Sequence, residues 1–127
     1  MVLADGSAIV RAGIKRLLAA VPEIQLVEEC NNADEAIAAI EEHRPDIVMM
    51  DFRLGTGTAV DVLRKCRATK PRPVRIVYTL DADANTRAIS YASGADVFFD
   101  KSRDMAPLLV MLRKMAATLL ENQSATV

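Results

Sequence analysis

The sequence predicts an α/β domain in which five short strands alternate with five helices and form one parallel sheet covered on both faces. Two observations support this prediction. Five short apolar runs rich in Val, Ile or Phe recur along the chain, and each run is continuous, as expected for strands that are buried on both sides. Between these runs, apolar residues recur with the three-to-four-residue period of a helix.

The expected strands and helices alternate from one end of the chain to the other. The strands are residues 2–4, 24–27, 47–50, 74–79 and 97–99. The helical stripes begin with Val10, Ala33, Ala59, Ala88 and Met105. Asn32, with Glu35 three positions later, resembles a capping box at the start of the second helix, and Asp104 is placed to cap the fifth.

This alternation restricts the topology. Right-handed crossovers leave few strand orders, and we expect the flavodoxin-like, doubly wound order 2-1-3-4-5 of a (βα)5 domain. Functional groups in such sheets gather at the carboxyl ends of the strands, near the switch point between the first and third strands.

Length and composition fit one domain. The chain has 127 residues, of which 51% are hydrophobic, and we expect a folded unit over residues 1–120 followed by a polar tail, 121–127. No apolar run reaches the roughly 18 residues that span a bilayer, and the run at residues 1–4 is too short for a signal peptide. We therefore expect a cytoplasmic protein that binds no membrane.

The charge balance favours no polyanionic partner, since the net charge is -1. One stretch is locally basic, and its cations are Arg64, Lys65, Arg67, Lys70, Arg72 and Arg75. We interpret it as a solvated helix edge and loop; an anion-binding patch is the alternative. No aromatic residues interleave with it, so direct nucleic-acid binding is not expected. Cys30 and Cys66 show no metal-ligand spacing, and His43 is the only histidine.

Reactive side chains follow four of the expected strands. Asp5 follows the first strand, Asp51 the third, and Lys101 lies just past the fifth, while Thr79 closes the fourth. Each residue type is common at such a position, as a turn residue, cap or solvated side chain. Together, two carboxylates, a hydroxyl and an ammonium at one sheet edge are suited to phosphoryl transfer onto a carboxylate.

These residues resemble the response-regulator receiver family of two-component signalling over almost the whole chain. The matching segments are 3–5, 44–51, 76–79 and 93–96, the last leading to Lys101. Segments 10–13 and 51–54 look most like the subfamily that often carries a C-terminal helix-turn-helix, which is not found in this sequence.

The resemblance implies a signalling switch rather than an enzyme. Asp51 matches the residue phosphorylated by a histidine kinase or phosphotransfer protein, and Lys101 and Thr79 match residues that bind the phosphoryl oxygens. Thr79 and Phe98 match the two switch positions. Asp5, Asp51 and the backbone carbonyl of Arg53 match the ligands of a Mg²⁺ ion. The resemblance also implies a downstream protein that binds the fourth helix, fifth strand and fifth helix.

Gly6 and Leu80 are two of the positions that depart from the family pattern. Gly6 replaces the second acid of the metal-binding pair, so weak Mg²⁺ binding is expected. Leu80 stands where a small residue often leaves the phosphate accessible. An alternative is therefore a degenerate receiver, an interaction module that acts without phosphorylation. An aspartyl phosphatase is disfavoured because Arg53 occupies the place of its second acid.

The fifth helix is more apolar than one sheet face requires. Its additional apolar residues are Val110, Met111, Met115 and Leu120. They indicate either packing by neighbouring elements or a face for a protein partner, including a possible homodimer.

Overall fold

The five-stranded parallel sheet is confirmed. The computed structural model describes the backbone of residues 1–125 and the side chains of residues 1–118. The sheet has the order β2-β1-β3-β6-β7. Its strands are β1 (Val2–Ala4), β2 (Glu28–Cys30), β3 (Ile47–Met50), β6 (Val74–Thr79) and β7 (Val97–Asp100), and all pairings within it are parallel.

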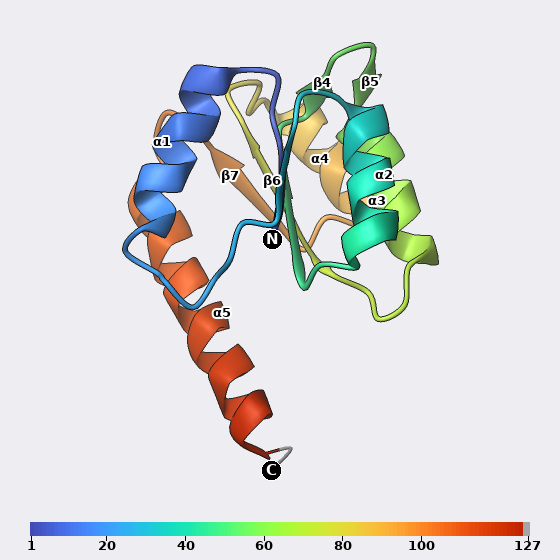
Figure 1. Ribbon diagram of the computed structural model, residues 1–127. Helices are drawn as coiled ribbons and strands as arrows, with labels where there is room; N and C mark the ends of the chain where they lie inside the picture. The colour runs from blue at the N-terminus through green and yellow to red at the C-terminus, as the bar shows by residue number, and fades with distance from the viewer. Residues whose placement is uncertain (126–127) are drawn as a thin grey trace.

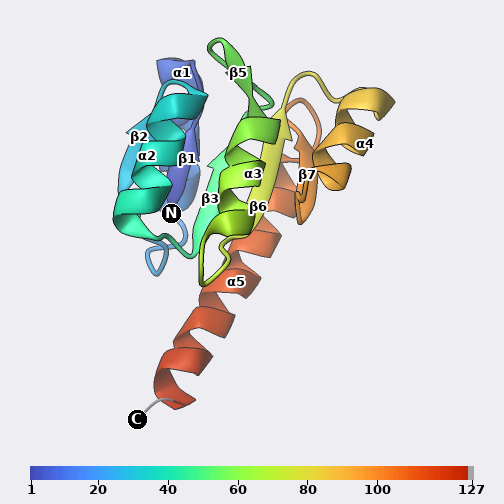
Figure 2. The same ribbon diagram turned by 90° about the vertical axis from the view of Figure 1, so that its right-hand side faces the viewer.

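Five helices cover the two faces of the sheet. They are α1 (Ala8–Leu18), α2 (Ala33–His43), α3 (Ala59–Ala68), α4 (Ala84–Ala92) and α5 (Met105–Ala125). Figure 1 shows α1 and α5 on one side and α2, α3 and α4 on the other, and Figure 2 shows the second group face on. No helix within the described residues is long and apolar enough to cross a membrane.

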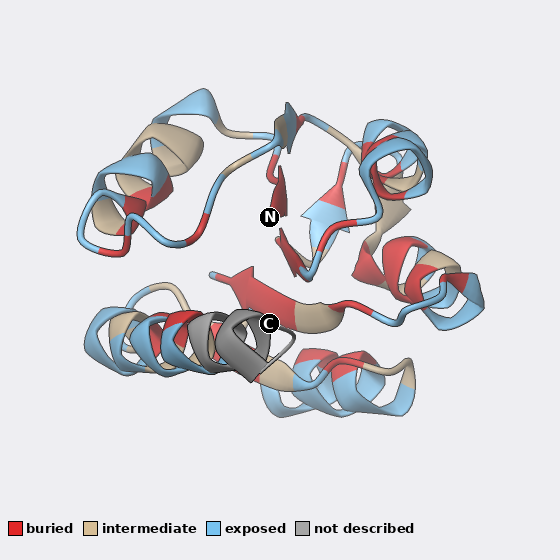
Figure 3. Ribbon diagram, turned by 60° about the horizontal axis from the view of Figure 1, so that its bottom comes forward, coloured by how far each residue is buried: buried red, intermediate tan, exposed pale blue. Residues whose placement is uncertain are grey.

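Each central strand contributes alternate side chains to two separate cores. Val48 and Met50 of β3 pack in the core beneath α2 and α3, whereas Met49 packs with α1 and α5. On β7, Phe98 faces the first core and Phe99 the second. This division explains the continuous apolar runs in the sequence, because both faces of these strands are buried. Figure 3 shows the buried residues concentrated along the strands and the facing sides of the helices.

Side-chain caps fix where four helices begin. Ser7, Asn32, Thr58 and Asp83 each accept a hydrogen bond from a backbone N–H in the first turn of α1, α2, α3 and α4, respectively. The capping interaction predicted for Asn32 and Glu35 is present, since the Asn32 side chain accepts from the Glu35 N–H at 2.9 Å. These caps place the loops that follow β1 and β6 at the carboxyl edge of the sheet.

The second strand was misplaced in the sequence analysis. It is Glu28–Cys30 and not residues 24–27, although the backbone of Val27 donates to the Met1 carbonyl. The apolar run leads into the strand and buries Ile24 in the α1–α5 core. Because β2 lies at the edge of the sheet, only Cys30 is fully buried and the two glutamates are exposed or half-exposed. The sequence of β2 therefore shows no apolar pattern.

A short hairpin between β3 and α3 was not predicted. Strands β4 (Arg53–Leu54) and β5 (Gly57–Thr58) pair antiparallel around a two-residue turn. Gly55 adopts φ +68°, a left-handed conformation that favours glycine. The hairpin holds the segment after Asp51 against the start of α2.

Helix α5 begins where expected and runs to Ala125, beyond the body of the domain (Figure 1). Asp104 directly precedes α5, and the Asp104 carbonyl accepts from the Leu108 N–H. The Asp104 carboxylate accepts from the Asp100 N–H, so it does not form the predicted cap of α5. Met111 and Met115 pack partly against the core, whereas Val110 is exposed. The side chain of Leu120 lies outside the described residues.

Candidate functional site

Lys101 joins two carboxylates at the carboxyl edge of the sheet. Its Nζ lies 2.6 Å from Oδ2 of Asp5 and 3.0 Å from Oδ2 of Asp51. The three residues come from the ends of β1, β3 and β7, so the topology brings together positions separated by 50 and 96 residues. The side chains are 6% exposed for Asp5, 7% for Lys101 and 20% for Asp51, which makes Asp51 the most accessible of the three.

Backbone groups orient both carboxylates. Oδ1 of Asp5 accepts from the Ser7 N–H at 2.8 Å, and Oδ1 of Asp51 accepts from the Phe52 N–H at 2.7 Å. Each carboxylate therefore uses one oxygen for the backbone and the other for Lys101. Since an ionised carboxylate has about four acceptor positions, both retain capacity for another ligand.

The environment of Lys101 keeps it charged. Burial alone would lower the pKa of Lys101, but the hydrogen bonds that Lys101 donates to Asp5 and Asp51, together with their negative charges, outweigh burial, so the pKa lies above its ordinary value of 10.5. The ring of Tyr78 lies 5.7 Å from Nζ and adds a cation–π contact. Lys101 is thus a fixed positive charge beside the Asp51 carboxylate.

Thr79 lies at the same edge. It is 1% exposed, and its carbonyl accepts from the Lys101 N–H at 3.0 Å. Its hydroxyl accepts from the Asp81 N–H at 3.2 Å. In this structure the Thr79 hydroxyl therefore holds the start of the β6–α4 loop through this hydrogen bond.

Phe98 is buried beneath two residues that the sequence analysis missed. The Arg87 guanidinium lies 5.4 Å from the ring centre of Tyr91 and 5.7 Å from that of Phe98. The Tyr91 hydroxyl accepts from the Phe98 N–H at 3.2 Å. Arg87 and Tyr91 lie four positions apart on α4, a spacing that could have indicated a shared helix face.

The side-chain contacts of two arginines near the site were also not predicted from the sequence. The Arg53 side chain pairs with Asp81 at 2.7 Å and so links the β4–β5 hairpin to the β6–α4 loop. Arg11 donates to the Asp5 carbonyl and pairs with Glu29 at 3.1 Å. Neither guanidinium could be placed from sequence spacing, because each partner lies on a different element.

The side chains of the basic run and of the cysteines take no part in the contacts of Asp5, Asp51 and Lys101, although the Cys30 carbonyl accepts from the Asp5 N–H at 3.0 Å. Lys65 pairs with Glu41, and Arg75 forms a two-point pair with Asp96, so part of the basic charge is neutralised locally. Both thiols are buried, and burial raises the pKa of Cys30 to about 12 and that of Cys66 to about 11. Both cysteines are therefore thiols at neutral pH.

Comparison with known proteins decides the family. The family model described as the response regulator receiver domain matches residues 1–113. This chain belongs to the response regulator receiver family. Its fold is thus that of the receiver domains of two-component signal transduction.

Two curated relatives are longer than this chain. The chain is 34% identical over 92 residues to a protein-glutamate methylesterase/protein-glutamine glutaminase of Agrobacterium fabrum, covering 70% of this chain and 26% of that protein. It is 25% identical over 117 residues to the nitrate/nitrite response regulator protein NarL of Escherichia coli K12, covering 92% and 54%. It thus spans about a quarter to a half of the length of these curated relatives.

A solved structure agrees with this assignment. A two-component response regulator of the LuxR family from Aurantimonas sp. SI85-9A1 superimposes with a TM-score of 0.82 at 28% identity, covering 92% of this chain and 84% of that chain. The receiver of a response regulator is mostly a non-enzymatic signalling module. The methylesterase relative bears an enzyme's name, but only about a quarter of that protein aligns with this chain.

The donor set at the acidic edge fits a hard divalent cation. Asp5 and Asp51 supply carboxylate oxygens, the type of ligand that Mg²⁺ prefers, and both have free acceptor positions. With Lys101, they carry a net charge of about -1, since two anions surround one cation. Gly6 adds no carboxylate, so the cation would depend on two protein anions.

Proposed function

We propose that this chain is a phospho-accepting receiver of a two-component phosphorelay, phosphorylated on Asp51 by a histidine kinase or phosphotransfer protein. The observation that supports this most directly is the contact of Lys101 with both Asp5 and Asp51. A buried ammonium beside a partly exposed carboxylate can stabilise negative charge that arrives on that carboxylate.

The proposed reaction transfers a phosphoryl group from a phosphohistidine to Asp51. A carboxylate oxygen of Asp51 attacks phosphorus, the phosphorus–nitrogen bond breaks, and the leaving imidazole takes up a proton. Lys101 binds a phosphoryl oxygen. Mg²⁺, held by Asp5, Asp51 and the Arg53 carbonyl, would neutralise phosphate charge.

Signal output in this proposal uses Thr79 and Phe98. The Thr79 hydroxyl exchanges its bond with the Asp81 N–H for one to the phosphoryl group, which moves the β6–α4 loop. The adjoining surface on α4, β7 and α5 exposes Ile89, Tyr91 and Val110. We propose this surface for a downstream protein or for a second copy of the chain.

Phosphorylation is testable without the cognate kinase. Incubation with acetyl phosphate and Mg²⁺ should add one phosphoryl group by intact mass spectrometry, and Asp51→Ala should remove the gain. Asp34→Ala, an exposed carboxylate on α2, is a matched control and should leave the gain intact. Absence of any gain in the wild-type chain, together with no spectral response to beryllofluoride, would refute the proposal.

The second candidate is a receiver that acts without phosphorylation. The observation that favours it is Gly6, which leaves only two carboxylates, both already bonded to Lys101. Leu80 is 70% exposed and lines a hollow next to Lys101 instead of lying buried. A partner that binds wild type and Asp51→Ala equally well would support this candidate, whereas a strict requirement for Asp51 would exclude it.

A further inference from the structure

We propose that Glu28, Glu42 and His43 form a second cation site, selective for a borderline divalent ion such as Zn²⁺ and separate from the acidic edge. Glu28 begins the edge strand β2, and the other two residues end α2. His43 Nε2 lies 3.9 Å from Oε1 of Glu28 and 4.0 Å from Oε2 of Glu42. Within the described residues, this is the group of three ligating side chains whose atoms all lie within 4.8 Å of one another.

The spacing suits an ion between the three groups. Zn²⁺ binds nitrogen and oxygen at about 2.0–2.2 Å, which places two ligand atoms of a tetrahedral site about 3.4 Å apart. The two separations from His43 Nε2 are larger than this by about half an ångström and too long for direct hydrogen bonds, and the oxygens of Glu28 and Glu42 lie within 4.8 Å of each other. The Glu42 side chain is 73% exposed, so it is free to close this gap.

The charges at this cluster are not balanced by other residues. Among the described residues, Glu28 and Glu42 form ion pairs with His43 and with no lysine or arginine. The neighbouring glutamates differ, since Glu29 pairs with Arg11 and Lys15. Two anions that share only an imidazole form a site of about -2 charge when the imidazole is neutral, and a divalent cation would neutralise it.

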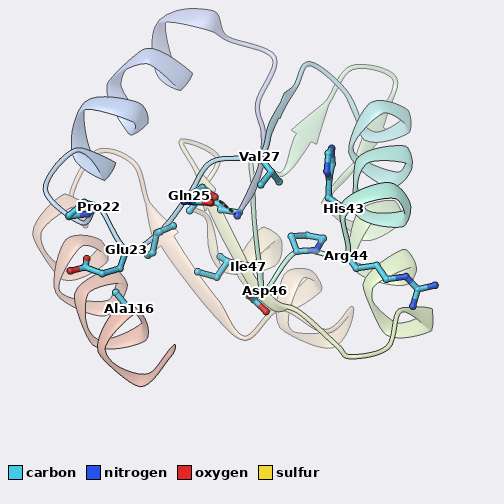
Figure 4. A pocket seen from close by; sticks show the side chains of 12 residues that line it. Pro22, Glu23, Gln25, Val27, His43, Arg44, Asp46, Ile47 and Ala116 are labelled. Carbon is cyan, nitrogen blue, oxygen red and sulfur yellow. Dashed lines mark hydrogen bonds between the residues drawn. The ribbon is translucent and has the colours of Figure 1, made fainter. Parts of the chain in front are cut away.

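Glu28 makes one further side-chain contact, to Cys30. The Cys30 thiol lies 4.0 Å from Oε2 of Glu28, two residues along the same strand, and leaves Oε1 directed to His43. Figure 4 shows the His43 ring extending from the end of α2 while the Arg44 side chain points away. His43 and Val27 line one hollow of about 470 Å³ at the amino ends of the strands, opposite the edge that holds Asp51.

The ligand chemistry decides the class of ion. Mg²⁺ prefers oxygen ligands and would use only the two glutamates, whereas imidazole nitrogen is a preferred ligand of Zn²⁺, Ni²⁺ and Cu²⁺. One imidazole and two carboxylates leave a fourth position for water. The Cys30 thiol is buried and is not one of the three clustered ligating side chains, so we assign the ion to His43 and the two glutamates.

Calorimetric titration of the whole chain with Zn²⁺ alone tests the site. We expect one equivalent to bind, with affinity reduced about tenfold or more in His43→Gln and in Glu42→Gln, because loss of even a ligand-orienting partner costs 10–100-fold in other metal sites. Glu23→Gln removes an exposed acid that is absent from the cluster and should bind like wild type. Far-UV circular dichroism confirms that each variant is folded.

Two further variants separate this site from the alternatives. Asp51→Asn should retain the Zn²⁺ equivalent, so failure of phosphorylation and failure of this inference are distinguishable. Cys30→Ser should also retain it, and Co²⁺ in place of Zn²⁺ should show no sulfur-to-metal absorption band. The inference is overturned if wild type binds no Zn²⁺, if His43→Gln binds it equally, or if Asp51→Asn abolishes binding.

Discussion

Replacement of Lys101 by methionine should destabilise the fold far more than replacement of Asp51 by asparagine. Lys101→Met keeps the length and most of the volume of the side chain but removes its charge. The Asp5 and Asp51 carboxylates would then face each other without the cation that now lies 2.6 and 3.0 Å from them. By contrast, Asp51→Asn leaves Lys101 paired with Asp5.

The magnitude follows from burial. Removal of one partner from a buried ion pair costs about 3–5 kcal/mol, because the remaining charge is left uncompensated. Lys101 and Asp5 are almost fully buried, so Lys101→Met belongs in this range. Asp51→Asn removes one of two anions around a single cation, and we expect a change within about 1 kcal/mol.

Urea unfolding at several pH values measures both the size and the sign. With an m-value of about 2 kcal/mol/M, a loss of 3–5 kcal/mol moves the midpoint down by about 1.5–2.5 M. In wild type, the raised pKa of Lys101 contributes stability at neutral pH, and this contribution is lost as pH rises through the folded-state pKa.

The double variant Asp5→Asn/Lys101→Met provides the control. It removes one anion together with the cation, so it should recover much of the stability lost in Lys101→Met. A Lys101→Met midpoint within about 0.5 M of wild type, equal to about 1 kcal/mol, would contradict the assignment of Lys101 as the charge that compensates this edge.

Three further changes test other parts of the structure. Leu108→Ala empties a fully buried position on the core-facing side of α5 and should cost about 2–5 kcal/mol in urea unfolding. Thr58→Ala removes the side chain that caps α3 and should cost about 0.5–2 kcal/mol by the same measurement. Hydrogen bonds from the Ser102 side chain and backbone lower the pKa of Asp100 below its ordinary value of 3.8. The stability that this group contributes is therefore present above pH 3.8 and is lost as pH falls through the lowered pKa. Asp100→Asn should thus make the free energy of unfolding less dependent on pH in the acid range.

The central strands and the meeting of Asp5, Asp51 and Lys101 were predictable from the sequence because one physical constraint determines both. A strand buried on two faces must be apolar throughout, and a reactive residue just past its end then lies at the carboxyl edge. The convergence of the three residues is confirmed, while their roles in phosphoryl transfer stay predictions. Thr79 satisfies the same constraint, since it pairs with Asp100 at the ends of β6 and β7.

The features that escaped prediction depend on contacts between elements. Strand β2 has only Cys30 fully buried, because an edge strand can expose its other residues. The Arg53–Asp81 pair joins two loops that are 28 residues apart in sequence, and no periodicity relates them. The Arg87 contact with Phe98 likewise needs the packing of α4 on β7 before it can be recognised.

The charge at the acidic edge indicates what Gly6 changes. Before the proposed reaction, Asp5, Asp51 and Lys101 carry about -1 in total. Transfer of a phosphoryl group removes the charge of Asp51 and adds about -2, so the edge then carries about -2. A divalent cation would neutralise that state fully, whereas a second acid in place of Gly6 would leave it negative. The glycine at position 6 therefore weakens the attraction of the edge for the cation before transfer. After transfer, the charge of the divalent cation equals that of the edge and is opposite in sign. The missing acid does not by itself exclude phosphorylation of Asp51.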